Sequence, residues 1–261
     1  MTPAAMDQKL SVIIITRNES HNLADCIRSV AFADEIIVVD SGSTDGTQQM
    51  ARDMGAVLVE TTQWPGFGPQ KNLALSKARF EWVLSIDADE RVSPQLQTEI
   101  LTKIHTSPET GAYFIPRLSS FLGHFIRHSG WYPDHVLRLF RRNAGQFSDS
   151  AVHEKFIPRT DCRQEKLSNH LIHFSYMNDS DYLRKLEHYS SAAAESAHAN
   201  NKSSSLRQSI GHAFWAFFKS YVLRLGFLDG RAGLMVAISS AESTYHKYLK
   251  IMLLGETRQR R

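Results

Sequence analysis

Four short apolar runs alternate with helix-like segments near the start of the chain, and this alternation limits the fold more than any other feature. The runs are Leu10–Ile15, Glu35–Asp40, Val57–Thr61 and Trp82–Ile86. Continuous apolar runs rich in β-branched residues are typical of strands buried on both faces of a parallel sheet. Because the intervening connections are short, the sequence predicts an α/β fold with a doubly wound, mostly parallel sheet.

Helices are expected between these strands and in the last third of the chain. Ser93 followed by Pro94 is a helix-start signal. After a less regular stretch, helices are expected at 181–198, 206–225 and 232–254, with a polar linker at 200–205. We therefore expect two parts, an α/β domain over residues 1–199 and a basic amphipathic helical region over residues 200–261.

Charge is distributed unevenly over these two parts. Residues 200–261 contain ten Lys and Arg against three acids, which gives +7, so the rest of the chain carries −4 of the total of +3. An anionic surface is a natural partner for such a basic end, although a solvated helix face without a partner explains it equally well. No nucleic-acid partner is expected.

Cysteine content and the N-terminus bear on the compartment. Cys26 and Cys162 are the only cysteines, so no disulfide framework is expected, and a reducing compartment is the simplest interpretation. The first ten residues lack the basic and apolar regions of a secretory signal. A cytoplasmic location is therefore expected.

Two carboxylates, Asp87 and Asp89, follow the fourth apolar run directly. Two such charges at the end of a buried strand require a counter-charge. A divalent cation is a suitable one, because Mg²⁺ and Mn²⁺ favour oxygen ligands and Mg²⁺ is often held by one or two carboxylates and substrate phosphates. The alternative is a solvated acidic turn before a helix.

A second polar cluster begins at Asp40, where the second apolar run ends in Asp-Ser-Gly-Ser-Thr-Asp-Gly. Ligands of doubly wound sheets bind at the carboxyl ends of the strands, so Asp40 is a candidate for holding a base or a ribose. The alternative is a capped strand–helix turn without a ligand. Neither a dinucleotide-binding glycine fingerprint nor a Walker A motif is present, which disfavours dinucleotide oxidoreductases and P-loop enzymes.

Four motifs in order, SVIIITRNE, IIVVDSGSTDGT, the pair Lys71-Asn72 and LSIDADE, resemble those of glycosyltransferase family 2. The resemblance covers roughly residues 10–105 and implies an inverting enzyme with the GT-A fold. The segments WYPDHVLRLFRR and AVHEKF and the basic helical end resemble the subgroup of lipopolysaccharide inner-core glucosyltransferases.

The resemblance assigns roles to individual residues. Positions that contact the donor nucleotide are matched by Thr16, Asn18, Glu19, Asp40, Ser41, Lys71 and Asp87. Of these, Asp40 matches the acid that recognises uracil, and Asp87 with Asp89 matches the metal and diphosphate motif. The implied cofactor is Mg²⁺ or Mn²⁺.

The general base is less constrained by the sequence. An inverting transfer needs a carboxylate to take the proton of the attacking hydroxyl. Glu154 is the first choice, with Asp134 and Asp149 as alternatives, and the neighbouring His153 is a candidate metal ligand. The alternative is that His153 and Glu154 form an exposed strand pair without a catalytic role.

Arg138, Arg141 and Arg142 are candidates for binding a phosphate or an anionic acceptor, or they lie on a solvated strand face.

The aromatic segment Ile210–Leu228 contains His212, Lys219 and Arg224 and so lacks the uncharged length of a spanning helix. It is typical of a helix lying in the interface of an anionic membrane, unless it packs on the catalytic core or on a second subunit.

The expected activity is transfer of a hexose, with glucose favoured, from a UDP-sugar to a lipopolysaccharide inner-core or similar lipid-linked saccharide. The expected place is the inner face of the plasma membrane, with the protein bound peripherally. Two rivals stay open at this point: a nucleotidyltransferase with a similar sheet, and a non-catalytic membrane-associated binding protein.

Overall fold

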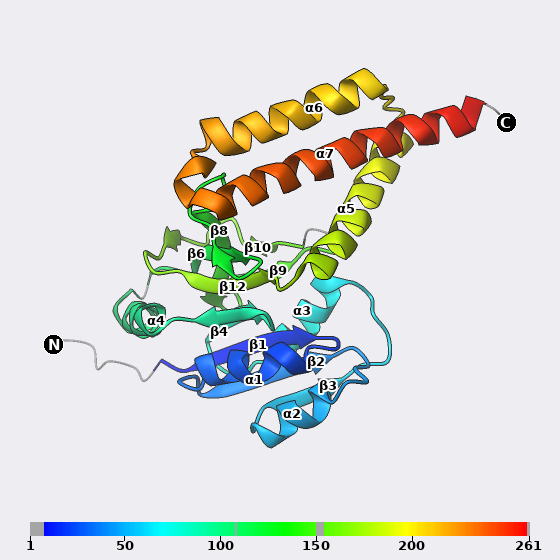
Figure 1. Ribbon diagram of the computed structural model, residues 1–261. Coiled ribbons are helices and arrows are strands. Elements are labelled where there is room, and N and C mark those ends of the chain that lie inside the picture. The colour runs from blue at the N-terminus through cyan, green and yellow to red at the C-terminus, as the bar shows by residue number, and fades with distance from the viewer. Residues whose placement is uncertain (1–7, 108, 150–153, 260–261) are drawn as a thin grey trace. The chain divides into compact units, whose positions relative to one another are not determined.

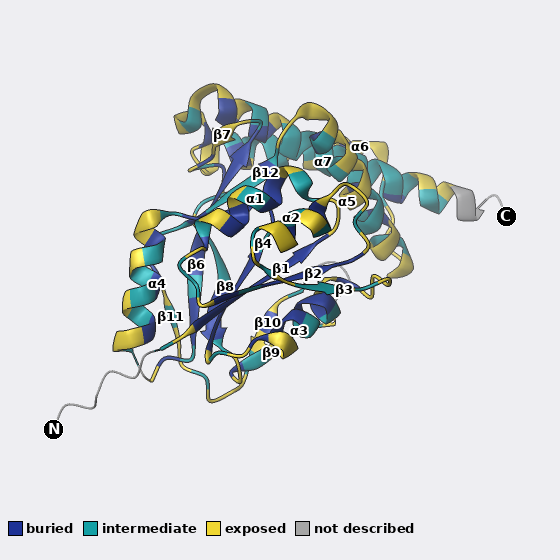
Figure 2. Cartoon of the chain, turned by 90° about the horizontal axis from the view of Figure 1, so that it is seen from below, coloured by how far each residue is buried: buried dark blue, intermediate teal, exposed yellow. Residues whose placement is uncertain are grey.

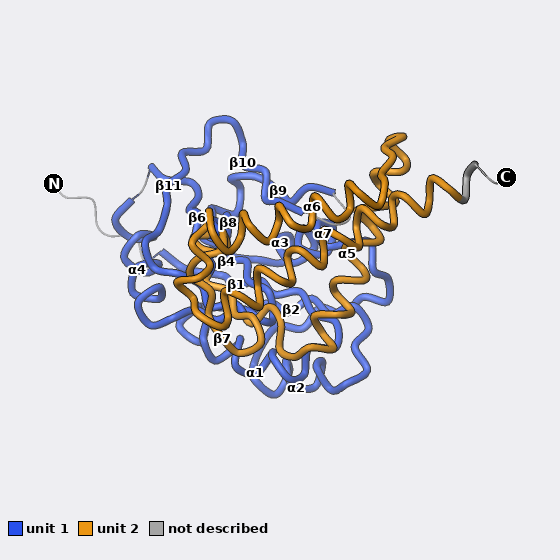
Figure 3. Tube along the Cα trace, turned by 45° about the horizontal axis from the view of Figure 1, so that its top comes forward, with its two compact units in different colours: residues 1–117, 134–173 blue, residues 118–133, 174–261 orange. Residues whose placement is uncertain are grey.

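The computed structural model describes residues 8–107, 109–149 and 154–259 (Figure 1). The chain separates into two compact units, coloured separately in Figure 3. Unit 1 comprises residues 1–117 and 134–173, and unit 2 comprises residues 118–133 and 174–261. The helix Asp179–Ala199, which precedes residue 200, belongs to the same compact unit as the helices that follow it. A domain boundary between residues 199 and 200 stays a prediction.

The sheet of unit 1 is built around four parallel strands in the order β3-β2-β1-β4. Their bounds are β1 Leu10–Thr16, β2 Glu35–Asp40, β3 Val57–Glu60 and β4 Trp82–Asp87. Beyond β4 the order continues β8-β6-β12-β5, and β8 runs antiparallel to both β4 and β6. The α/β fold class with its parallel nucleus is confirmed.

The strands beyond the parallel nucleus all follow β4 in the chain and range from two to ten residues. They are β5 Glu90–Val92, β6 Ala112–Phe121, β8 Asp134–Arg141, β11 Gln164–Lys166 and β12 Leu171–Tyr176. β11 pairs with the start of β6, and the two-residue strand β7 His124–Phe125 pairs with its end in unit 2. The sequence did not predict β5, β7, β11 or the three-residue strand β9 Gly145–Phe147, because runs of two or three residues carry no periodicity.

Helices cover both faces of the sheet, and β1 shows this most directly. Leu10, Val12 and Ile14 belong to one apolar cluster, while Ile13 and Ile15 belong to the other. Helices α1 Ser20–Ser29, α2 Thr47–Asp53 and α4 Pro94–Thr106 contribute to the first cluster, and α3 Phe67–Lys77 to the second. Strands with two buried faces explain why these runs are apolar throughout. Figure 2 shows the central strands β1, β2 and β4 largely buried and the outer sides of the helices exposed.

Helix starts follow local chemistry. The Ser93 side chain accepts a hydrogen bond from the Leu96 amide at 3.2 Å, and Pro94 takes the first helical position, as expected. α3 begins at Phe67, within a Gly- and Pro-containing stretch whose composition is typical of a loop. Gly66, with φ at +113°, supplies the break before the helix, and Pro69 is tolerated because the first turn needs no amide donor.

A separate two-stranded ribbon packs against α3. It consists of β9 Gly145–Phe147 and β10 Phe156–Pro158, and Phe156 stacks on Phe140 with ring centroids 3.8 Å apart. The Asn72 side chain of α3 donates to the Phe147 carbonyl at 2.9 Å and accepts from the Phe147 amide at 2.8 Å. This clamp fixes the ribbon, and with it the residues just before β10, next to α3.

Unit 2 contains the helices α5 Asp179–Ala199, α6 Leu206–Phe218 and α7 Gly230–Gln259. Between α6 and α7 lie a π-helical turn, η1 Lys219–Leu223, and a 3₁₀ turn, η2 Gly226–Asp229. α7 packs against both α5 and α6. Within the described ranges, none of the helices combines the length and apolar character needed to cross a bilayer.

Trp131 belongs to an aromatic cluster in unit 2. Its ring lies edge-on to Phe121 at 5.8 Å, and Tyr176 and Tyr182 surround the same phenylalanine. Trp131 is therefore a packing residue in this structure.

We predict that Glu35→Gln destabilises the protein by about 1–3 kcal/mol at pH 7, because the buried carboxylate accepts from the Ser11 hydroxyl and from Arg79. Burial raises the pKa of Glu35, but these donors outweigh it and hold the pKa below its usual value. The stabilisation is thus present above the unfolded pKa of about 4.3 and is lost as pH falls through the folded pKa.

Urea unfolding at pH 7 and pH 3.5 measures this difference. Asp25→Asn is the control, because Asp25 is exposed and pairs only locally with Arg28. A gap between wild type and Glu35→Gln that does not shrink at the lower pH contradicts the assignment.

Candidate active site

Asp40 ends β2 in a fully buried position. Its Oδ1 accepts from the Ser43 amide at 2.9 Å and from the Gln48 side chain at 2.6 Å. Its Oδ2 accepts from the Thr16 hydroxyl at 3.0 Å and from the Ser43 hydroxyl. Burial raises the pKa of Asp40, but the donors of Ser43, Gln48 and Thr16 outweigh it and leave the pKa below its usual value. The carboxylate is therefore ionised at neutral pH.

The turn after β1 is joined to the turn after β2. The Asn18 amide donates to the Ser43 hydroxyl at 2.7 Å, and the Asn18 side chain accepts from the Thr44 amide at 2.9 Å. The Glu19 amide donates to the Thr47 hydroxyl at 2.9 Å. Asn18 has φ at +58°, a conformation that Asn tolerates better than most residues. The candidate residues Thr16, Asn18 and Glu19 thus lie together with the Asp40 turn.

Ser41 connects this turn to α3. Its amide donates to the Thr16 carbonyl at 3.0 Å, and its hydroxyl accepts from the Gln70 side chain at 3.0 Å. Gln70 also donates to the Thr61 hydroxyl at 2.9 Å. Gln70 therefore links α3 to the ends of β2 and β3, a role that sequence reasoning missed.

Lys71, on α3, lies between two of the candidate carboxylates. Its Nζ is 2.9 Å from Asp87 Oδ1 and 2.7 Å from Glu154 Oε1, and the lysine side chain is only 3% exposed. Glu154 precedes β10 in the ribbon that Asn72 clamps to α3. Three of the candidate residues thus meet at one point.

Arg138, on β8, contacts the other oxygen of Asp87. It also lies 2.9 Å from Glu90, which is fully buried and accepts from the Asp87 amide at 2.9 Å. Burial raises the pKa of Asp87, but Arg138 and Lys71 outweigh it and hold the pKa far below its usual range. Asp87 is therefore a permanent anion whose charge is compensated by two protein cations.

Asp89 faces a residue that the sequence analysis did not select. Its Oδ2 lies 3.4 Å from Nε2 of His173 on β12, the register partner of Glu90 on β5. Across the described part of the chain, no group of three or more His, Cys, Asp or Glu side chains gathers for a metal ion. His153, the expected histidine ligand, lies outside the described residues.

A cavity of about 560 Å³ opens beside these residues, lined by Asp87, Lys71, Arg138, Glu154 and Asp134. Asp134 is half-exposed and pairs with Arg117 at 2.6 Å. Asp149, the other alternative base, is exposed and is not among the lining residues. Glu154 and Asp134 therefore share a cavity with Asp87, whereas Asp149 does not.

Comparison with protein-family models decides the family. Residues 11–164 match the model described as glycosyl transferase family 2. The chain belongs to glycosyl transferase family 2. The match extends well past the four motifs and includes both the Asp87 turn and Glu154.

Relatives that match nearly the whole chain are also named glycosyltransferases. An uncharacterized glycosyltransferase of Rickettsia prowazekii (strain Madrid E) is 30% identical over 94% of this chain and 87% of its own length. A lipopolysaccharide core biosynthesis glycosyltransferase, LpsC, of Rhizobium meliloti (strain 1021) is 28% identical over 92% of this chain and 93% of its own. The similarity to proteins named glycosyltransferases thus extends over nearly the whole chain.

A mannosyltransferase from Pyrobaculum calidifontis, solved with GDP-Man and Mn²⁺, is similar in fold. It has a TM-score of 0.52 and 18% identity over 93% of this chain and 75% of that one. The GT-A-like fold of this family 2 glycosyltransferase is thereby confirmed.

Proposed function

We propose that this family 2 glycosyltransferase moves a hexose, with glucose favoured, from a UDP-sugar to a lipopolysaccharide inner-core or similar lipid-linked saccharide, with inversion. One observation carries the proposal. The registers of β1 with β2 and β4 put Asp40 and Asp87 at the same edge of the sheet, two strands apart. Two strand spacings are about 10 Å, a separation suited to the base and the diphosphate of one nucleotide.

In this proposal Asp40 binds the nucleotide base, and one of the protein groups that now donate a hydrogen bond to its carboxylate must first be displaced. A carboxylate has about four acceptor positions. Thr16, Gln48 and the two donors of Ser43 already fill them. Gln48 is the only long, half-exposed side chain of the three, so we propose that the uracil N–H replaces its amide. Asn18, Glu19 and Ser41 then shape the rim of the same site.

Asp89 and His173 are the proposed protein ligands of a divalent cation. A separation of 3.4 Å matches two neighbouring ligand atoms that are each about 2.1 Å from one ion. Carboxylate and imidazole both suit Mn²⁺, and substrate phosphates complete such sites. When bound, the cation supplies positive charge to the departing UDP. Asp87 is already neutralised by Lys71 and Arg138, so its proposed place is beside the diphosphate, with those two cations.

Glu154 is the proposed base. Its Oε1 faces Lys71 at 2.7 Å, and the residue lines the cavity that also contains Asp87. The acceptor hydroxyl attacks C1 of the sugar as the C1–O bond to the diphosphate breaks, and Glu154 takes the hydroxyl proton. Asp134 is the weaker candidate, because Arg117 occupies it with two hydrogen bonds, at 3.0 and 2.6 Å.

The membrane part of the proposal rests on unit 2. Twenty large apolar side chains of the described chain are exposed, and nine of them fall within residues 206–228. Phe214 is 71% and Trp215 53% exposed, and Leu206, Ile210 and Phe214 follow one another at the spacing of a helix face. We call the following nine the C-terminal apolar face: Leu206, Ile210, Phe214, Trp215, Val222, Leu223, Leu225, Phe227 and Leu228.

Basic residues accompany the C-terminal apolar face. Arg207, Lys219, Arg224 and Arg231 are exposed within or next to it. Apolar bulk with flanking cations favours an anionic lipid surface over a neutral one. The relative named for lipopolysaccharide core biosynthesis is consistent with a lipid-linked acceptor held at such a surface.

Glu154→Gln is expected to lower kcat by about 100-fold or more while leaving UDP binding near wild type, because the amide cannot accept the proton. Transfer from UDP-glucose to a lipid-linked acceptor is measured together with calorimetric binding of UDP. Asp149→Asn is the matched control and is expected to retain activity. A Glu154→Gln enzyme that transfers normally, or that loses UDP binding, contradicts the assignment of Glu154 as the base.

The released product distinguishes the proposal from a nucleotidyltransferase, which would release pyrophosphate rather than UDP. The same assay, supplemented with a pyrophosphate readout, answers this. A protein that binds UDP-glucose and membranes but forms neither product would support the non-catalytic alternative.

Phe214→Glu combined with Trp215→Glu is expected to reduce binding to vesicles of phosphatidylcholine and phosphatidylglycerol by about tenfold or more. The double variant replaces exposed apolar area by negative charges, which the anionic lipid repels. Co-sedimentation at two salt concentrations measures the effect. Leu183→Glu, at an exposed site on α5, is the control. Equal binding of the double variant and the wild type would show that the C-terminal apolar face does not contact the membrane.

A further inference from the structure

A second cavity, of about 580 Å³, lies at the edge of the sheet opposite to the proposed donor site. Its lining comes from the segments before β4 and β6, from the end of β8, and from the loop after β10. Trp82 and Asp87 mark the two ends of β4, so the two edges are about 16 Å apart along the strand. The proposed function makes no use of this cavity.

Arginines dominate the lining. The cavity has five of them and three acids, Glu81, Glu109 and Asp161, which gives the lining an excess of two positive charges. The arginines are Arg79, Arg141, Arg142, Arg159 and Arg163. Residues 1–199 as a whole carry −4, so this cavity stands out from an acidic background.

The lining segments are tied together by their backbones. The Arg141 amide donates to the Gly111 carbonyl at 2.8 Å, and the Gly111 amide donates to the Arg163 carbonyl at 2.9 Å. The Arg142 amide donates to the Glu81 carbonyl at 2.7 Å. A Cβ at residue 111 would lie 2.6 Å from the Cys162 sulfur, so glycine is what allows this close approach. The arginines are thus presented by a fixed frame.

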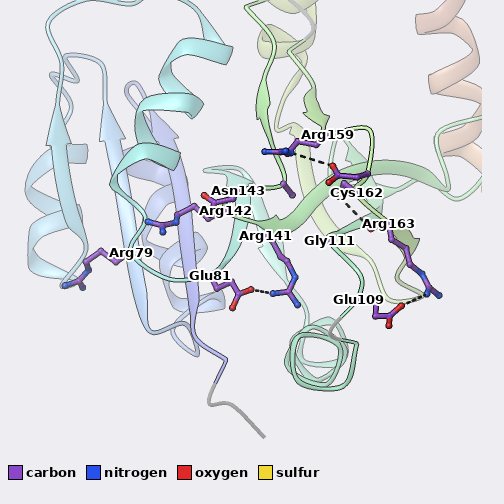
Figure 4. A pocket seen from close by; sticks show the side chains of 12 residues that line it. Arg79, Glu81, Glu109, Gly111, Arg141, Arg142, Asn143, Arg159, Cys162 and Arg163 are labelled. Atoms are coloured by element: carbon purple, nitrogen blue, oxygen red, sulfur yellow. Dashed lines mark hydrogen bonds and ion pairs between the residues drawn. The ribbon is translucent and has the colours of Figure 1, made fainter. Parts of the chain in front are cut away.

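Arg141 is the inner cation of the cavity. Its guanidinium lies over the Trp82 ring at 4.8 Å and pairs with Glu81, toward which it turns in Figure 4. Burial lowers the pKa of Arg141. An anion placed beside this guanidinium would offset the cost of burying its charge.

Two of the outer arginines are weakly paired with carboxylates of the lining, whereas Arg79 donates to Glu35 at 2.7 Å. Arg159 lies 3.6 Å from Asp161, and Arg163 lies 3.8 Å from Glu109, in pairs whose side chains are all more than 60% exposed. Exposed pairs at such distances contribute little to stability. Arg163 also has a shorter contact, at 3.2 Å, with Glu165. Within the part of the chain that is described, no carboxylate pairs with Arg142, whose guanidinium donates to the Ala78 carbonyl at 3.1 Å.

We propose that this arginine cavity binds a phosphate-bearing saccharide at a site separate from the transfer site. Guanidinium groups bind phosphate oxygens through two parallel hydrogen bonds, and several arginines around one frame suit a doubly charged group. Glu81, Asp161 and the Asn143 amide supply acceptors for sugar hydroxyls. The lining contains no aromatic side chain on which a base could stack, so a nucleotide is disfavoured.

Arg142→Ala combined with Arg159→Ala tests the site directly, because both side chains are exposed and their loss leaves the frame intact. Calorimetric titration of the full-length protein with glucose 6-phosphate, inorganic phosphate and glucose gives the affinities. We expect saturable binding of glucose 6-phosphate, weaker binding of phosphate and none of glucose. In the double variant, we expect a loss of about tenfold or more. Arg28→Ala, at an exposed site on α1 that does not line the cavity, is the control and should bind as wild type does.

UDP binding, measured on the same variants, separates this proposal from the proposed function. We expect it to be unchanged in the double variant. Three results would overturn the arginine cavity as a saccharide phosphate site: no saturable binding to the wild type, equal binding of phosphate and glucose 6-phosphate, or equal affinity in the double variant and in Arg28→Ala.

Discussion

The charge of Asp87 is the constraint on which the rest of the site depends. An anion at the end of a buried strand is costly to desolvate, and here Lys71 and Arg138 each compensate one of its two oxygens. Those two cations in turn require further anions, which Glu154 and the fully buried Glu90 provide. A chain of alternating charges thus joins α3, the end of β4, β5, β8 and the ribbon that carries Glu154.

This chain of charges also supports different proposed roles for the two carboxylates of the motif, Asp87 and Asp89. Asp87 is paired with two protein cations, so in the proposed function it holds these cations beside the diphosphate without a metal of its own. Within the described residues, Asp89 pairs with no Lys or Arg and faces His173, whose imidazole is a ligand type at a distance suited to sharing one ion. We therefore propose that Asp87 organises the protein charges of the site and that Asp89 binds the cation.

The parallel nucleus of the sheet and the candidates at its carboxyl edge could be predicted from the sequence. The apolar runs of β1, β2 and β4 carry their own signal, and parallel strands necessarily bring their ends to one edge. Gln70, Glu90 and His173 escaped notice because their importance comes from long-range pairing. His173 lies between the apolar residues Ile172 and Phe174, and only the pairing of β12 with β5 brings it to Asp89. The start of α3 at Phe67 could not be predicted, because Gly66, Gly68 and Pro69 are residue types typical of a loop.

The most direct measurement is calorimetric binding of UDP with Mn²⁺ and, separately, with a chelator, for the wild type, Asp89→Asn, His173→Gln and the control His105→Gln on the exposed end of α4. The account predicts that Mn²⁺ strengthens UDP binding to the wild type and to the control, and that the Asp89 and His173 variants lose about tenfold or more of this gain. Equal UDP affinity with and without Mn²⁺ in the wild type, or an undiminished Mn²⁺ effect in both variants, would contradict it.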